Sequence, residues 1–400
     1  MAFIASRMDR IKPSPSSMAG QRARELRAAG RDIVGLTAGE PDFDTPDNVA
    51  QAVIRAMSQS KTKYTDIGGT PELKAAIAEK FKRDNDLAYS ANEIIVGNGG
   101  KQIIFNALLS TVEEGDEVLI PTPYWVSYPD IVLLAGGTPV FVPGPPEKGF
   151  KLQPEDLERA ITPRTRWLIL NGPNNPSGAA YSREELQALA DVLLRHPQVW
   201  VMTDDIYEHI LYDGRSFHTL AQVEPALQAR TLTINGVSKA YAMTGWRIGY
   251  GGAPAELVRA MTKLQSQSTS NPSSISQAAA QEALSGPQGF IAERTAIFQT
   301  RRDAIVAQIN QMPGLSCHVP EGAFYAFPSC AGVLGRKTPA GKILQTDEDF
   351  VMYLLDEENL AVLQGAAYGV SPFFRLSYAT SMDVIDEGCR RLKRACEKLA

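Results

Sequence analysis

Cysteine and histidine are scarce in this 400-residue chain, which contains four of each. The cysteines are confined to the last quarter and include no C-x-x-C pair: Cys317, Cys330, Cys389 and Cys396. The histidines lack the spacing of metal ligands: His196, His209, His218 and His318. These absences argue against a disulfide framework and against a metal site, so we expect reduced thiols and no metal.

Long apolar runs and blocks of like charge are also missing. No stretch reaches the roughly 18 apolar residues of a membrane span, and residues 1–17 contain no signal-peptide core. Lys and Arg are scattered, and the formal net charge is -5. A nucleic-acid surface needs clustered positive charge. We therefore expect a cytoplasmic protein that binds neither nucleic acid nor membrane, although small anionic ligands are compatible with this charge.

What the sequence does contain is an alternation of strand-like and helical segments. Apolar, strand-like runs lie at 93–97, 117–121, 139–143, 166–171, 198–205 and 230–235, and helical patterns at 101–112 and 182–196. This alternation predicts an α/β fold with a mostly parallel sheet, whose ligands lie at the carboxyl ends of the strands. After about residue 290 the pattern changes to a long charged helix, strand-like segments at 322–328 and 373–379, and a helix near 347–359. It predicts a second, smaller α+β domain.

The strand at 93–97 runs into the residues NGGKQ, in which Gly99 and Gly100 form a tight turn before a helix. The free backbone N–H groups of such a helix start suit a phosphate. The dinucleotide pattern G-x-G-x-x-G begins at Gly97 but fails at Gln102, and the P-loop ending fails at the same residue. A nucleotide is therefore disfavoured, and a plain structural turn is the alternative.

Residues 235–250, NGVSKAYAMTGWRIGY, place a single lysine among small and apolar neighbours. Between Ser238 and Arg247, every residue except Lys239 is uncharged. Desolvation lowers the pKa of a lysine, and the neutral amine can attack carbonyls to form Schiff bases. A structural lysine with a snorkelling stem is the alternative, and these residues alone do not separate the two.

Polar residues follow two further strands of the predicted sheet. RWLILN runs into GPNNPSG, where Asn174 and Asn175 can each present an amide or cap their own backbone. QVWVMTDD places Asp204 and Asp205 beside Tyr207. Adjacent residues of a strand point to opposite faces, so only one of the two carboxylates can address the cleft. A helix N-cap or a solvated charge is the alternative.

Together these features meet the needs of one cofactor. A phosphate-binding turn, an Asn, an Asp with Tyr at +3, and a Lys with Arg at +8 follow in that order at successive strand ends. Pyridoxal 5'-phosphate has a phosphate, a ring nitrogen that must stay protonated, a phenolic oxygen and an aldehyde that condenses with lysine. The chain resembles the fold-type-I pyridoxal-phosphate aminotransferases, specifically the bacterial aspartate aminotransferase branch. The resemblance rests on IKPSPS, LTAGEPDFDTP, KYTDIGG, GGKQIIFNAL, PYWVSYP, NNPSG, DDIYEH, SKAYAMTGWRIGY and FRLSYA.

The resemblance implies a large domain at 46–290 with a mostly parallel seven-stranded sheet, and a smaller α+β domain formed by 1–45 and 291–400. Lys239 would form the internal aldimine and carry a proton, while Asp204 would hold the protonated pyridine nitrogen. The other implied cofactor contacts are Tyr207 and Asn175 on the phenolic oxygen, Trp125 on the ring face, and Gly99, Gly100, Lys101, Ser238 and Arg247 around the phosphate. Tyr64 would reach the phosphate of the neighbouring subunit, which implies a homodimer with shared active sites.

On the substrate side, the resemblance implies that Arg375 binds the α-carboxylate bidentately, assisted by Asn175, Trp125 and the Gly39 backbone. In the vertebrate-type branch an arginine binds the distal carboxylate, and this chain has Ser266 at that position. The branch that it resembles uses a lysine of the phosphate turn, here Lys101, with Ser14 and Ser16 as helpers. Some relatives also transaminate prephenate, an ability linked with an N-terminal lysine, here Lys12.

The implied reaction is reversible amino transfer between L-aspartate and 2-oxoglutarate, by a ping-pong mechanism through internal and external aldimine, quinonoid and pyridoxamine forms. Formation of arogenate from prephenate is a further hypothesis. Two alternatives stay open. One is an aromatic or broad-specificity aminotransferase, or a C–S lyase, of the same fold. The other is a non-catalytic regulatory protein, whose usual mark, a DNA-binding extension, is not expected here.

Overall fold

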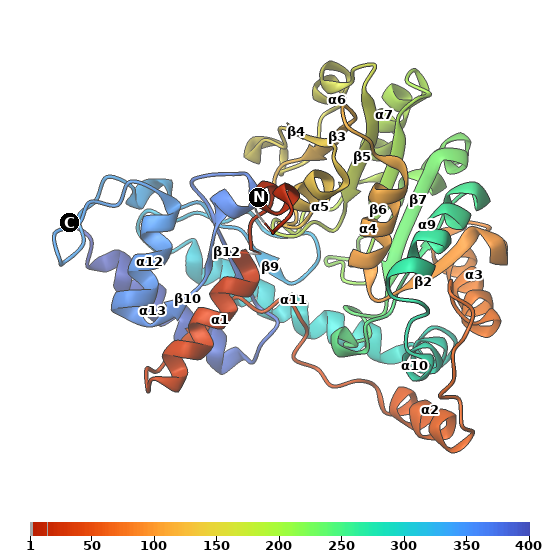
Figure 1. Cartoon of the computed structure of the whole chain (residues 1–400). Coiled ribbons are helices and arrows are strands. Elements are labelled where there is room, and N and C mark those ends of the chain that lie inside the picture. Colours follow the sequence, from red (N-terminus) through yellow and green to blue (C-terminus); the bar gives the residue numbers. More distant parts are fainter. Residues whose placement is uncertain (1–2, 14) are drawn as a thin grey trace.

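The computed structural model describes residues 3–13 and 15–400, except the side chains of residues 15–17 and 19. A seven-stranded sheet forms the centre of the larger part of the molecule (Figure 1). The strand order is β2-β8-β7-β6-β5-β3-β4. The bounds are β2 (Ile94–Gly97), β3 (Glu117–Pro121), β4 (Thr138–Val142), β5 (Thr165–Asn171), β6 (Trp200–Asp204), β7 (Thr231–Gly236) and β8 (Gly249–Gly252). β8 runs antiparallel to both β2 and β7, and the other neighbouring pairs are parallel. The prediction of a mostly parallel sheet is confirmed.

Helices cover both faces of this sheet because its strands are apolar on both sides. In β5, Trp167 and Ile169 pack with α4 (Gly100–Thr111), α5 (Tyr128–Ala135) and α9 (Ala255–Ser268). Leu168 and Leu170, which point the other way, pack with α6 (Pro154–Ala160), α7 (Arg183–Leu194) and α8 (Leu220–Val223). Each fully buried aliphatic side chain stabilises this packing by about 1.5–3 kcal/mol. The helices predicted at 101–112 and 182–196 are α4 and α7.

Strand β8 is the one strand of this sheet that lies outside the predicted runs. Its sequence, GYGG, has none of the β-branched residues that mark the other strands. The structure shows why glycine is needed, because a Cβ at Gly249 would overlap the backbone of Gly100 at the start of α4. The absence of a side chain at Gly249 lets the turn of Gly99 and Gly100 lie directly on β8.

Beside β2 and β8, a helical layer is built by α2 (Asp47–Ser58), α3 (Pro71–Asn85) and α10 (Ser274–Ser285). Short 3-10 helices complete the connections: η1 (Ser6–Arg10), η2 (Ala91–Glu93), η3 (Pro146–Lys148), η4 (Pro225–Arg230), η5 (Thr244–Trp246), η6 (Ala331–Val333) and η7 (Gly365–Tyr368). In the described part of the chain, no helix combines the length and apolarity needed to cross a membrane.

The C-terminal part has its own core and recruits the start of the chain. β1 (Val34–Gly35) pairs in parallel with β10 (Leu360–Ala361), and β11 (Leu363–Gln364), β12 (Phe374–Ser377) and β9 (Tyr325–Ala326) form an antiparallel sheet. Figure 1 shows α1 (Pro15–Ala28) on this side with α12 (Asp347–Glu358) and α13 (Met382–Glu397), while α11 (Gly289–Ile309) runs between the two parts. The strand-like segments predicted at 322–328 and 373–379 contain shorter strands. The β1–β10 pairing supports the domain boundaries given above, which remain a proposal.

Candidate active site

A cleft of about 680 Å³ opens where the strands of the large sheet end. Its wall contains residues that follow β2, β3, β5, β6 and β7, together with residues of the C-terminal part. Eleven residues selected from the sequence line it: Gly39, Gly100, Lys101, Trp125, Asn175, Asp204, Tyr207, Ser238, Lys239, Arg247 and Arg375. The fold therefore brings together in one cavity residues that lie more than 300 positions apart in the chain.

Lys239 lies in the cleft without a carboxylate in ion-pair contact among the described residues. Its Nζ donates a hydrogen bond of 2.5 Å to the carbonyl oxygen of Gly39 and lies 5.7 Å from the centre of the Tyr207 ring. Burial lowers the pKa of Lys239 to about 8, and the positive charge of Arg375 adds to this, against a smaller opposing effect of Asp204. A sizeable fraction of this amine is thus neutral near neutral pH, as a nucleophile or a base requires.

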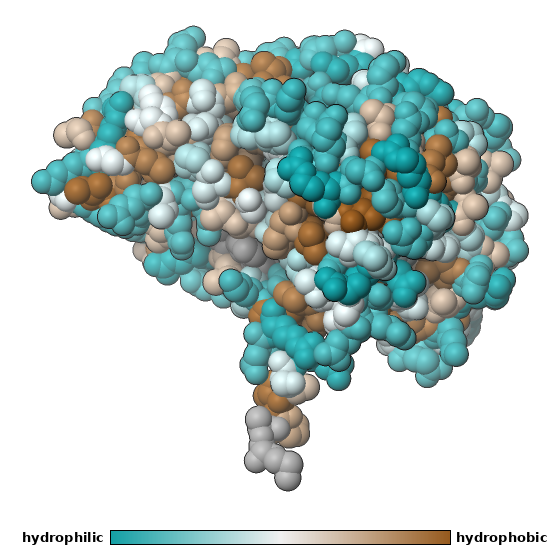
Figure 2. Space-filling view, turned by 90° about the horizontal axis from the view of Figure 1, so that it is seen from above, coloured by the Kyte–Doolittle hydropathy of each residue, from teal (hydrophilic) through white to brown (hydrophobic). Residues whose placement is uncertain are grey.

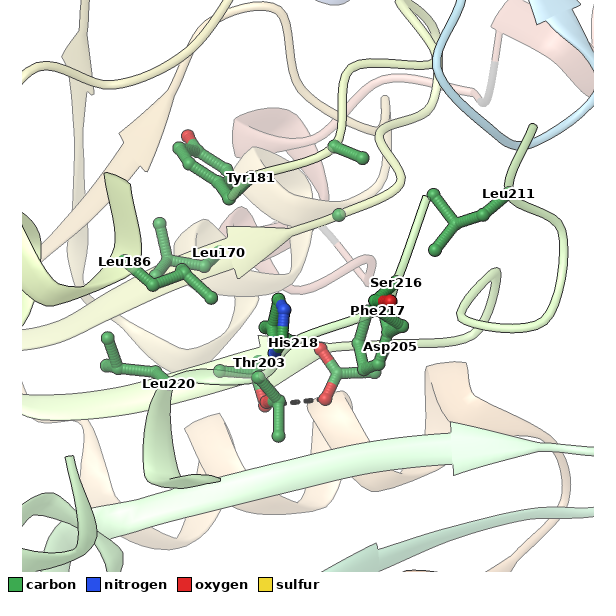
Figure 3. Close-up of a pocket in the computed structure, with 13 residues that line it drawn as sticks. Leu170, Tyr181, Leu186, Thr203, Asp205, Leu211, Ser216, Phe217, His218 and Leu220 are labelled. Carbon is green, nitrogen blue, oxygen red and sulfur yellow. Dashed lines mark hydrogen bonds between the residues drawn. The ribbon is translucent and has the colours of Figure 1, made fainter. Parts of the chain in front are cut away.

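Asp204 and Asp205 lie on opposite faces of the sheet. Asp204 is buried in the wall of the cleft, where its Oδ2 accepts a hydrogen bond of 2.6 Å from the hydroxyl of Tyr128. Burial raises the pKa of Asp204, and the hydrogen bond from Tyr128 opposes that rise. Asp205 instead lines a separate cavity of about 20 Å³, with His218 and with Thr203, whose Oγ1 donates to it at 3.3 Å (Figure 3). Alternation along the chain allows one of the two to face the cleft, and that one is Asp204.

The turn at the start of α4 is shaped around Arg247. Gly99 has a φ of 86°, and a Cβ there would overlap the Arg247 guanidinium. Arg247 is held by bonds from Nη1 to the Thr244 carbonyl, 2.9 Å, and from Nη2 to the Asn98 carbonyl, 3.2 Å. Its charge, the N-terminus of α4 and the nearby hydroxyl of Ser238 form a setting that favours an anion.

Lys101, on the first turn of α4, extends over the indole of Trp125. Its Nζ lies 4.8 Å from the ring centre, within the range of a cation–π interaction. Lys101 as a whole is exposed, but partial desolvation of its amine in the cleft and the positive charge of Arg247 lower its pKa. The cleft therefore holds a cation that is separate from Lys239 and from Arg375.

Arg375, on β12, is buried at the opposite side of the cleft. Nη1 donates to Oδ1 of Asn175 and Nη2 donates to the carbonyl oxygen of Thr37, both at 2.9 Å. The guanidinium lies between two aromatic rings, 4.4 Å from the centre of Tyr325 and 5.3 Å from that of Tyr368. These two bonds use two of its five N–H donors, and its buried Nε has no hydrogen-bond partner among the described residues. A carboxylate of a ligand fits these remaining donors.

Among the cleft residues that the sequence analysis did not select, Tyr128 and Tyr325 contact selected residues directly. Tyr128 bonds to Asp204, and the hydroxyl oxygen of Tyr325 lies 2.9 Å from that of Tyr207. The sequence signal that could have indicated Tyr128 was its position at the start of a helix, three residues after Trp125. In the structure the two rings meet edge to face, with their centres 5.3 Å apart. Tyr325 lies in GAFYAFP, which the sequence marks only as strand-like.

Several predicted residues lie elsewhere. Tyr64 is 91% exposed and Lys12 is exposed, with its backbone N–H bonded to Asp130, and neither lines the cleft. Ser266 is exposed on α9, where its hydroxyl bonds to the Lys263 carbonyl. Ser14 and the side chain of Ser16 lie outside the described residues. The roles predicted for Tyr64, Lys12, Ser14 and Ser16 remain predictions.

Comparison with known proteins shows the family of the chain. Residues 31–392 match the family model described as aminotransferase class I and II. The chain is 57% identical, over the full length of both, to an aspartate/prephenate aminotransferase of Cereibacter sphaeroides. Its structure is similar to the crystal structure of an aspartate aminotransferase from Rhizobium meliloti, with a TM-score of 0.98 and 56% identity over both whole chains. It is also similar to the Thermus thermophilus aspartate aminotransferase with maleate, with a TM-score of 0.92 and 41% identity over 99% of this chain and 100% of that one. The chain belongs to the class I and II aminotransferases.

Proposed function

We propose that this aminotransferase uses pyridoxal 5'-phosphate to transfer the amino group of L-aspartate to 2-oxoglutarate. The main observation in support of this proposal is that Lys239, with its pKa lowered to about 8, shares one cleft with Asp204, Tyr207 and Arg247. The residues fit the cofactor: a cradle of glycine and arginine for the phosphate, a buried carboxylate for the ring nitrogen and a hydroxyl for the phenolic oxygen. When bound, the cofactor supplies an aldehyde that condenses with amines and a ring that withdraws electrons.

Each side chain then has a defined task. The lowered pKa lets Lys239 act as an amine and afterwards take and return the substrate's Cα proton. Asp204, oriented by Tyr128, keeps a proton on the ring nitrogen, because a carboxylate beside it favours the charged form. Tyr207 and Asn175 would hydrogen-bond the phenolic oxygen, and Trp125 would cover the ring.

The two carboxylates of aspartate require two separate cations. Arg375 would bind the α-carboxylate as a planar fork, since it is buried and preset by Asn175 and Thr37. Lys101 would bind the distal carboxylate, because it lines the cleft with its Nζ over the Trp125 ring, and Ser266 lies away from the cleft. The relatives named for aspartate, and the one solved with maleate, a dicarboxylate, support this choice.

Prephenate is proposed as a second substrate, on the basis of a relative named for both substrates. Lys12 does not line the cleft in this arrangement, so its role requires the segment before α1 to close over the substrate. Arogenate formation with glutamate or aspartate as donor tests this, and the absence of product rejects it.

We further propose a homodimer in which Tyr64 completes the partner's phosphate site. A tyrosine that is 91% exposed has no packing role within its own chain. The segment that begins at Phe3 also projects from the body of the molecule (Figure 2), with Phe3 99% and Ile4 62% exposed. Such apolar exposure is compatible with burial against a second copy.

A steady-state screen of amino donors against 2-oxoglutarate and oxaloacetate tests the main proposal. Aspartate with 2-oxoglutarate, and glutamate with oxaloacetate, should give the highest kcat/KM. A preference for phenylalanine or tyrosine would indicate an aromatic aminotransferase, and release of a thiol and pyruvate from cystathionine would indicate a C–S lyase. Borohydride reduction should fix the cofactor to the peptide that contains Lys239, and fixation on another lysine would overturn the assignment.

A further inference from the structure

Tyr325 occupies the point where the two halves of the cleft meet. It lies on β9, which pairs with β12 so that Tyr325 is opposite Ser377. Arg375 is two residues before Ser377 and therefore on the same face of β12, in reach of the Tyr325 ring. This register places the ring 4.4 Å beneath the Arg375 guanidinium. A buried cation–π contact of this kind restrains the orientation of Arg375.

The hydroxyl of the same side chain reaches the other part of the molecule. Its oxygen lies 2.9 Å from the hydroxyl oxygen of Tyr207, which follows β6 of the large sheet. It also lies close to Gly39, whose carbonyl oxygen accepts the bond from Lys239. Both tyrosines are buried, and burial raises the pKa of each, so both stay protonated and neutral.

In a pair of hydroxyls in contact, one donates a hydrogen bond to the other, and the accepting hydroxyl can donate its own proton to a third group. When Tyr325 donates to Tyr207, the Tyr207 proton is free to point into the cleft, and the donation polarises it into a stronger donor. The Tyr325 ring meanwhile supports the group that binds the α-carboxylate. One side chain thus serves both the cofactor side and the substrate side of the cleft.

We propose that Tyr325 is a positioning residue with two separable functions. Its hydroxyl directs the Tyr207 hydroxyl toward the phenolic oxygen of the cofactor, and its ring sets the Arg375 guanidinium for the substrate's α-carboxylate. This proposal rests on the proposed function, because it requires the cofactor and the substrate orientation given above.

Two substitutions separate the functions. Tyr325→Phe removes the hydroxyl and keeps the ring, whereas Tyr325→Leu removes both. Tyr378→Phe is the matched control, because it removes a hydroxyl that contacts another buried tyrosine, Tyr212, at 3.3 Å in the same core but does not line the cleft. Two quantities are measured on the cofactor-loaded protein without turnover: the pKa at which its visible absorption changes, and the Kd of maleate.

In Tyr325→Phe the absorption pKa should rise by about 0.5 unit, because the phenolic oxygen then accepts a weaker hydrogen bond from Tyr207. Its Kd for maleate should stay within about twofold of the wild type, and Tyr378→Phe should change neither quantity. Tyr325→Leu should raise the same pKa and also weaken maleate about 5- to 30-fold, as expected for the loss of a desolvated cation–π contact.

An unchanged absorption pKa in Tyr325→Phe, or an unchanged Kd in Tyr325→Leu, overturns the corresponding function of Tyr325. An equal shift in Tyr378→Phe also overturns the proposal, because the effect would then be a general loosening of the core. If the wild-type protein shows no visible band with pyridoxal 5'-phosphate, the proposed function itself fails, and the role of Tyr325 fails with it. The two failures are therefore distinguishable.

Discussion

Two lysines of this chain are removed from water with opposite results. Lys80, on α3, is fully buried, and its Nζ contacts a carboxylate oxygen of Glu208 and donates to Oδ1 of Asn85 at 2.7 Å. Asn85 in turn donates to Glu208 at 2.7 Å, and these contacts lower the pKa of Glu208 despite its burial. Lys239 has only a carbonyl oxygen in hydrogen-bond contact among the described residues. The positive charges of Arg375 and Arg247 lower its pKa, and the carboxylates of Asp204 and Glu40 oppose this without forming an ion pair with it. Burial produces a reactive amine only where no anion is placed to hold the charge.

The two environments come from one short segment. In DDIYEH, Asp204 and Tyr207 face the cleft that contains Lys239, while Glu208 points away and pairs with Lys80. The carboxylate next to the reactive lysine is engaged by Tyr128 rather than by the lysine. This separation keeps Lys239 free for chemistry.

The largest expected effect is that of Lys239→Ala on catalysis. Loss of the amine removes both the nucleophile and the proton carrier, so kcat should fall by at least about 10⁴-fold. The measurement is the half-reaction with aspartate, followed by the cofactor's absorption. Lys80→Met should retain most of this rate in its folded fraction, and a comparable loss there would remove the distinction between the two lysines.

Asp204→Ala should reduce transamination by about 10³-fold, or about 4 kcal/mol in the activation free energy. The reason is that the ring nitrogen loses the anion that keeps it protonated. Asp205→Ala is the matched control, because Asp205 is equally buried but lines the small cavity of Figure 3. If the Asp205 variant were the slower enzyme, the assignment of the two faces would be wrong.

Lys80→Met should lower the free energy of unfolding by about 3–5 kcal/mol, because Glu208 becomes a buried charge without its partner. Urea denaturation of the variant measures this loss. The double change Lys80→Met with Glu208→Gln should recover a large part of it, since the remaining carboxamide is neutral. Without such recovery, the loss would come from packing of the lysine stem and not from the charge.

The sequence predicted much of this arrangement, for identifiable reasons. Strands β2 to β7 are rich in apolar and β-branched residues, and the isolation of Lys239 is visible in its uncharged neighbours. β8 could not be predicted in this way, because its glycines are required by contacts with distant segments, Gly249 with the start of α4 and Gly252 with the ring of Tyr89. Because side chains alternate along a strand, only one of Asp204 and Asp205 could face the cleft. Which face of the strand borders the cleft is known only from the folded chain.

Contacts between distant segments were the other limit. Tyr128 is 76 residues from Asp204, and Tyr325 is 118 residues from Tyr207. Their local sequences indicate a helix start and a strand, and nothing in either indicates a partner. The same holds for Lys80, whose helix has an ordinary charged pattern and whose Glu208 partner follows a strand of the sheet.

Lys101 is an intermediate case. It is a partly desolvated lysine, and we propose that its charge pairs with a carboxylate of the substrate. Lys101→Ala should reduce kcat/KM for aspartate by the equivalent of about 2–4 kcal/mol, the loss of one partner of a desolvated charge pair. Alanine, which has no distal carboxylate, should be affected far less. The affinity for pyridoxal 5'-phosphate is measured in the same variant, and equal losses for both donors would place Lys101 on the cofactor side.

The smallest expected effect comes from the most direct comparison of the two lysines. Each is changed to Met, and only the stability of the protein without cofactor is measured. The pKa of Lys239 is lowered from 10.5 to about 8, so the unfolded chain binds more protons between these two pH values. The linkage relation then makes the wild type gain stability as the pH rises from about 8 to 10.5. Below pH 8, the folded protein carries the full cost of a charged, desolvated amine.

Lys239→Met removes that cost, so at pH 7 its free energy of unfolding should exceed that of the wild type by about 1–3 kcal/mol, a value reduced for partial exposure of the side chain. The difference should shrink above pH 8 and vanish above about pH 10.5, where the wild-type lysine becomes neutral in both states. Lys80→Met should remain less stable than the wild type at pH 7. A destabilised Lys239→Met at pH 7 would mean that the folded chain does hold the Lys239 charge favourably, and the contrast between a paired and an unpaired buried lysine would then be lost.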